Sequence, residues 1–191
     1  MSTQFDIDID FGDRDAVLKL IQHTPASMLR DGELVKHNTG VYVNPIPTDP
    51  FTGLSSLDYE TAEQLGYIKL DLLNVHVYNQ IRDEAHLEEL ISREPLWEML
   101  RHREFVEQLI HLNNHFGTVQ QHFPDTLDKL AMILAIIRPA KRHLIGKTWR
   151  EISESVWTRP DDGSYFFKRA HAYGYAQLVW VHMNLLTQLP D

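Results

Sequence analysis

The chain has 191 residues, of which 43% are hydrophobic and 24% charged, a composition typical of a folded globular protein. It contains no cysteine, which excludes disulfides, thiolate zinc sites and cysteine nucleophiles. The net charge of −9 argues against a general nucleic-acid coat protein, but it leaves room for a nucleic-acid enzyme, since such an enzyme depends on where its charges lie. No apolar run approaches the roughly 18 residues that span a bilayer, and no signal peptide is evident, so we expect a cytoplasmic protein without membrane contact.

The segment 5–11 alternates acidic and apolar residues, which is the period of a β-strand. The acids are Asp6, Asp8 and Asp10, and the apolar residues are Ile7, Ile9 and Phe11. On a strand the acids would share one face and the apolar side chains would pack into a core on the other. Same-face neighbours are about 6.6 Å apart, close enough for two carboxylates to share Mg²⁺ or Mn²⁺. The alternative is an acidic edge strand that prevents aggregation.

The remaining elements follow from hydrophobic periodicity and from proline and glycine positions. We predict short helices at 16–22 and 57–65, a polar loop after the first of them, and strands at 40–44 and 67–73. From Val75 onward the period becomes helical, with helices expected at 77–92, 96–115, 127–137, 149–157 and 165–189. The sequence therefore predicts a single α+β domain over 1–191, with a small sheet in 1–74 and a mainly helical region in 75–191.

A second charged strand face is predicted at 67–73, where Lys69 and Asp71 lie two residues apart and the apolar Ile68, Leu70 and Leu72 occupy the core face. Two carboxylates on one strand and a third on a neighbour form a usual ligand set for two-metal phosphoryl transfer. Lys69 would then neutralise charge on a triphosphate. The alternative is a plain charged face of an amphipathic strand.

Five short segments resemble, in the same order, motifs of bacterial replicative DNA polymerase III α subunits, the C-family polymerases. They are Phe-Asp-Ile-Asp-Ile-Asp-Phe at 5–11, Lys-His-Asn-Thr-Gly-Val-Tyr-Val at 36–43, Gly-Tyr-Ile-Lys-Leu-Asp-Leu-Leu at 66–73, Ile-Arg-Pro at 137–139 and Phe-Lys-Arg-Ala-His at 167–171. The resemblance spans nearly the whole chain. It implies a polymerase β-like nucleotidyltransferase palm that acts on a nucleic-acid end with a nucleoside triphosphate.

The same resemblance implies residue roles. Asp6, Asp8 and Asp71 would be catalytic ligands of Mg²⁺ or Mn²⁺, and Lys69 would contact phosphate. The candidates for nucleotide or DNA phosphates are His37, Arg138, Lys141, Arg142, Lys168, Arg169 and His171. For each of these basic residues the alternative is a solvated surface charge.

The chain also departs from the family. The segments 12–35 and 148–164 are far shorter than the family's, and Ala140 replaces the glycine after Arg-Pro, so we expect a much reduced version without processive replication. A second hypothesis is therefore a catalytically inactive accessory, decoy or inhibitor that binds replication proteins. Carboxyl groups of Asp6, Asp8 and Asp71 around one common point would favour the enzyme, and a lysine or arginine at that point would favour the accessory.

Overall fold

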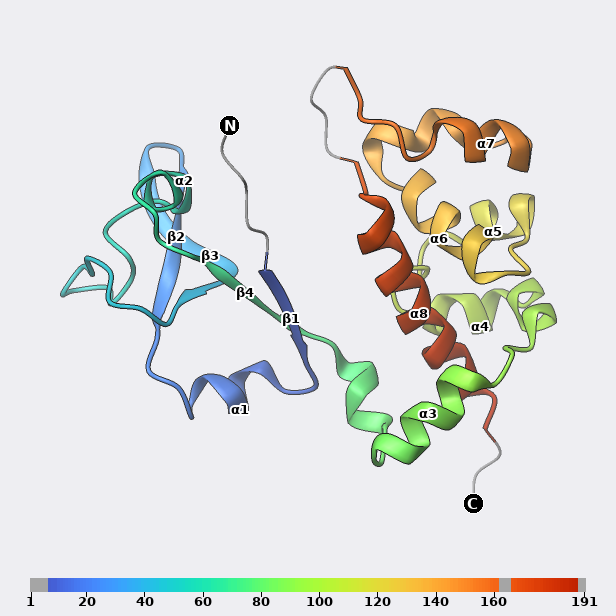
Figure 1. Cartoon of the computed structure of the whole chain (residues 1–191), viewed down its shortest axis with the longest axis horizontal. Coiled ribbons are helices and arrows are strands. Elements are labelled where there is room, and N and C mark those ends of the chain that lie inside the picture. The colour runs from blue at the N-terminus through green and yellow to red at the C-terminus, as the bar shows by residue number, and fades with distance from the viewer. Residues whose placement is uncertain (1–6, 162–165, 189–191) are drawn as a thin grey trace. The chain divides into compact units, whose positions relative to one another are not determined.

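The computed structural model describes residues 7–161 and 166–188, and the chain divides into two compact units between Gln80 and Ile81. The first unit contains a four-stranded mixed sheet and the second is helical, which confirms the α+β class (Figure 1). Within the described residues, no helix combines the length and apolar character needed to cross a membrane.

The sheet has the strand order β1-β4-β3-β2. Its strands are β1 (Ile7–Phe11), β2 (Thr24–Arg30), β3 (Glu33–Tyr42) and β4 (Leu70–Asn74). β1 and β4 are parallel, whereas β4 with β3 and β3 with β2 are antiparallel. The predicted proximity of segments 5–11 and 67–73 is confirmed by the pairing of β1 with β4.

The hairpin of β2 and β3 was not predicted, since a loop was expected before residue 40. Its turn is Asp31-Gly32, with φ values of 53° and 85°. Both residues are left-handed, as a two-residue turn between twisted strands requires, and Asp-Gly is a strong hairpin signal. The hairpin places His37 and Thr39 on a strand beside β4.

One core cluster of the first unit is formed by Ala26, Tyr42, Ile46 and Ala62. Val41, Leu72, Val75 and Val77 are also buried. Its helical segments are α1 (Arg14–Leu18), α2 (Tyr59–Gln64) and the 3₁₀ helix η1 (His76–Gln80), and α1 and α2 begin at the capping carboxylates of Asp13 and Asp58.

The predicted core face of β1 is wrong in one respect. Ile7 and Ile9 are each 37% exposed, and Ile68 is 50% exposed. The physical reason is position: β1 is an edge strand, and the buried residues described in this unit lie on the other strands and in the segments that follow β3 and β4. Phe11 is half-buried, and Leu72 on β4 is buried as expected.

The second unit is built on α6, whose residues 130, 131 and 133–136 have no exposed surface and which packs against the long α8. Its helices are α3 (Glu84–Ser92), η2 (Trp97–Arg101), α4 (Arg103–Gln108), α5 (Phe116–His122), α6 (Leu127–Ile136), η3 (Pro139–Leu144), α7 (Trp149–Ser155) and α8 (Arg169–Leu186). The single helix expected at 96–115 is wrong, because the backbone is extended at His102, between η2 and α4, and again at Leu109, which ends α4. His111 and Asn114 then adopt positive φ values of 64° and 104°.

Candidate functional site

Asp8 on β1 and Asp71 on β4 are direct partners in the strand register. Paired positions of neighbouring strands share one face of a sheet, so the fold brings together two of the three predicted metal ligands. Asp6, the third, lies outside the described residues. Asp8 is exposed, whereas Asp71 retains only 7% of its surface.

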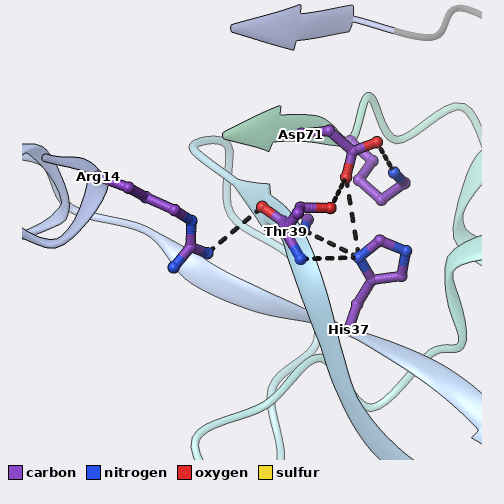
Figure 2. Close-up of polar contacts among 6 residues, drawn as sticks. Arg14, His37, Thr39 and Asp71 are labelled. Atoms are coloured by element: carbon purple, nitrogen blue, oxygen red, sulfur yellow. Dashed lines mark hydrogen bonds and ion pairs between the residues drawn. The ribbon is translucent and has the colours of Figure 1, made fainter. Parts of the chain in front are cut away.

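Both oxygens of the buried Asp71 carboxylate have partners (Figure 2). The Thr39 hydroxyl donates to Oδ1 at 2.7 Å, and the Lys69 ammonium forms an ion pair with Oδ2. A buried charge is costly unless it is paired and hydrogen-bonded, and these two donors meet that requirement. The position beside Oδ2 is thus held by a lysine that immediately precedes β4.

His37 lies near Asp71 but is not its ionic partner. Its Nδ1 is 3.7 Å from Asp71 Oδ1 and accepts the backbone N–H groups of Gly40, at 2.9 Å, and Thr39, at 3.3 Å. The ring proton is therefore on Nε2. Burial, and next the Lys69 charge, lower the pKa of His37 below its usual value, while Asp71 opposes them. The ring is neutral at pH 7 and presents an Nε2–H donor.

Three residues that complete the site were not predicted: Arg14, Thr39 and Gly40. A Cβ at Gly40 would lie 2.7 Å from Lys69 Cδ and 2.9 Å from His37 Nδ1, so only glycine leaves room for the lysine to reach Asp71. Arg14, whose side chain is 13% exposed, donates to the Thr39 carbonyl at 3.4 Å. Thr39 and Gly40 adjoin the predicted His37, which was a usable signal, whereas nothing local marks Arg14.

The described residues fit a metal site only in part. Among residues 7–161 and 166–188 no group of three or more histidine or carboxylate side chains is arranged to hold an ion. The predicted set includes Asp6, so it stays a prediction. Asp8 and Asp71 offer the hard oxygen ligands that Mg²⁺ and Mn²⁺ prefer. A cation at Asp71 Oδ2 would require Lys69 to move away.

Asp10 has a separate environment. The Tyr78 hydroxyl donates to its Oδ2 at 3.4 Å. Burial, followed by the Asp10 charge, raises the pKa of Tyr78. Asp10 is therefore linked to η1, and its hydrogen bond ties the end of β1 to that helix.

The predicted basic residues other than His37 lie in the second unit. Lys141 is buried, and its ammonium donates to the Ser155 carbonyl at 2.8 Å and the Thr158 hydroxyl at 3.2 Å, where it holds the end of α7. Burial lowers the pKa of Lys141. Its assignment to phosphate stays a prediction that this geometry does not favour.

The other basic residues are more accessible. Arg142, Lys168 and Arg169 are exposed, and Arg169 lies over the Tyr173 ring at 5.5 Å. His171 is half-buried beside the aromatic rings of Phe167 and Tyr175. Their assignment to nucleotide or DNA phosphates stays a prediction.

No family model matches this sequence, and no curated protein is similar to it at a significant level. Function is therefore inferred from the geometry of the site and from the motif resemblance.

Proposed function

We propose that this chain is a reduced, metal-dependent nucleotidyltransferase of the C-family DNA polymerase kind, with its sheet serving as a polymerase β-like palm. The observation that supports this most is the register of β1 and β4, in which Asp8 lies opposite Asp71. Two carboxylates on adjacent strands, with a lysine two residues from one of them, are the arrangement that phosphoryl transfer uses. The substrates would be a nucleic-acid end and a nucleoside triphosphate, in the cytoplasm.

The residues divide the work by their chemistry. Asp6, Asp8 and Asp71 would hold Mg²⁺ or Mn²⁺, which would supply charge neutralisation for an attacking hydroxyl and a leaving oxygen. Thr39 fixes Asp71 through Oδ1 and leaves Oδ2 as the oxygen whose partner can change. Lys69 would leave Oδ2 and bind a phosphate oxygen of the triphosphate. The neutral His37 would donate its Nε2–H to a second phosphate oxygen.

The test is incubation of the full chain with Mg²⁺ or Mn²⁺, labelled nucleoside triphosphates and a set of primers. Wild type should extend or label a primer end, and Asp71→Asn should abolish labelling because it removes a metal ligand. Asp31→Asn is the matched control, since Asp31 is exposed in the β2–β3 turn, where Asn-Gly forms the same turn as Asp-Gly, and it should label as wild type does. Labelling that survives Asp71→Asn would contradict the proposal.

The Lys69–Asp71 ion pair favours a second candidate, a catalytically inactive accessory that binds a replication protein. In this case the lysine permanently replaces a cation, and the carboxylate needs no metal. Millimolar Mn²⁺ distinguishes the two, because an ion that binds only the native state raises the melting temperature. The enzyme should be stabilised and Asp71→Asn should lose the effect. An unchanged melting temperature for wild type would leave the accessory as the better explanation.

A further inference from the structure

The second unit contains a group of nitrogen-rich side chains that the proposed metal chemistry does not use. His111 and His115 lie between α4 and α5, Arg138 is the N-cap residue of η3, and Arg142 lies within η3. We call these four residues the arginine–histidine cluster.

Arg138 has a defined orientation but no ionic partner among residues 7–161 and 166–188. Its guanidinium lies over the Phe167 ring at 4.6 Å, which fixes the plane of its N–H donors. Its Nε is buried without a hydrogen-bond partner, and among the described residues no carboxylate forms an ion pair with it. The residue as a whole stays partly exposed, so a small ligand can reach it.

His111 also has a buried nitrogen without a hydrogen-bond partner among the described residues. Its Nε2 is also buried without a partner, and its ring meets Tyr175 edge-on at 4.3 Å. A buried polar atom without a partner costs free energy, so both atoms need a hydrogen-bond partner, which is either an ordered water or a ligand.

The charges of the cluster are also uncompensated. Burial and then the Arg138 charge lower the pKa of His111 to about 4, and burial followed by the Arg138 and Arg142 charges lowers that of His115. Within the part of the chain that the structure describes, no carboxylate acts on either ring in the opposite direction. The cluster is thus a region of positive potential around neutral imidazoles.

We propose that the arginine–histidine cluster binds a phosphate group, held by the guanidinium of Arg138 with Arg142 and the imidazoles as further contacts. The planar fork of arginine matches two phosphate oxygens, and neutral imidazoles can donate to the others. Inorganic phosphate, a nucleotide and a nucleic-acid backbone share this chemistry. The inference does not depend on the metal site, because none of its residues belongs to the first unit.

The test is a titration of the full chain with inorganic phosphate, in which the NMR signals of the histidine rings report binding. We expect the His111 and His115 signals to shift in a saturable way and the pKa of His111 to rise, because the anion offsets the Arg138 charge. Arg138→Met should weaken binding about tenfold or more, as for loss of a charge-assisted hydrogen bond. Arg142→Gln, at an exposed position, should weaken it less and provides a second test if Arg138→Met does not fold.

Arg150→Met is the matched control, since Arg150 is exposed and already paired with Glu154 at 3.0 Å. It should bind phosphate as wild type does. Parallel titrations with a nucleoside triphosphate and with a single-stranded oligonucleotide distinguish the sources of the phosphate. The ligand that binds with the highest affinity indicates the natural class. The proposal is overturned if the two histidine signals do not move at tens of millimolar phosphate, or if wild type and the Arg138→Met and Arg142→Gln variants bind equally. Neither result bears on Mn²⁺ binding at Asp71.

Discussion

At the scale of single residues, the Asp71 carboxylate depends on donors from two strands. Lys69 comes from just before β4, and Thr39 comes from β3. Arg14 in turn donates to the Thr39 carbonyl, so a chain of contacts links the start of α1 to Asp71 (Figure 2). Loss of one member should therefore affect the stability of the first unit as well as its chemistry.

Thr39→Val tests this link. Valine has a similar shape but no hydroxyl, so Asp71 Oδ1 would lose its 2.7 Å hydrogen bond. We expect the free energy of unfolding to fall by about 1–2 kcal/mol, as for a hydrogen bond to a charged group, measured by urea denaturation. Thr39→Ser retains the donor and should stay close to wild type. Equal stability of the valine and serine variants would show that the hydroxyl contributes nothing.

Buried histidines make stability depend on pH. His122 Nε2 accepts the Gly146 N–H at 3.0 Å, and His182 Nδ1 accepts the Ile110 N–H at 3.1 Å. Burial lowers the pKa of both, and that of His111 to about 4. The unfolded rings titrate near 6.5, so between about pH 6.5 and 4 the unfolded chain binds more protons.

We therefore expect full stability above about pH 6.5 and a progressive loss as the pH falls toward 4, measured as the urea midpoint across this window. His182→Gln keeps an acceptor without a titratable ring and should reduce the slope. A midpoint that is constant from neutral pH to about pH 5 would contradict neutral burial of these rings.

At the scale of elements, glycines have opposite effects in a turn and in a helix. Gly32 has a φ of 85° in the β2–β3 turn, whereas Gly174 lies inside α8 with open space around it. Gly32→Ala should destabilise by about 1–2 kcal/mol, because a Cβ is strained in the left-handed region. Gly174→Ala should stabilise by about 0.5–1 kcal/mol. Thermal melts of the two variants test this, and shifts of the same sign would be inconsistent with the turn or with the helix.

At the scale of the whole molecule, the two units differ in the size of their hydrophobic cores. Among the described residues, 24 buried hydrophobic side chains lie in the second unit and eight in the first. We expect a fragment of residues 81–191 to unfold cooperatively on its own, measured by circular dichroism. A fragment of residues 1–80 should be much less stable. A non-cooperative melt of 81–191 would show that its fold needs the first unit.

Local sequence determined most of the secondary structure. The alternation at 5–11 and 67–73 predicted the strands that pair as β1 and β4, and apolar periodicity predicted α6 and the body of α8. The Asp31-Gly32 pair is also a local hairpin signal, although a loop was expected there. The breaks at His102 and Leu109 were not, because neither position carries the proline or glycine that marks a break locally.

Tertiary structure decided which residues meet. The sequence indicated that Asp8 and Asp71 belong to one site, since both lie on predicted strands, but only the parallel register sets them opposite each other. It could not show that Lys69 and Thr39 would occupy both oxygens of Asp71, or that Arg138 would lie over the Phe167 ring. Alternation on a strand fixes the face of a side chain, whereas burial and the pairing of charges depend on contacts between segments far apart in the chain.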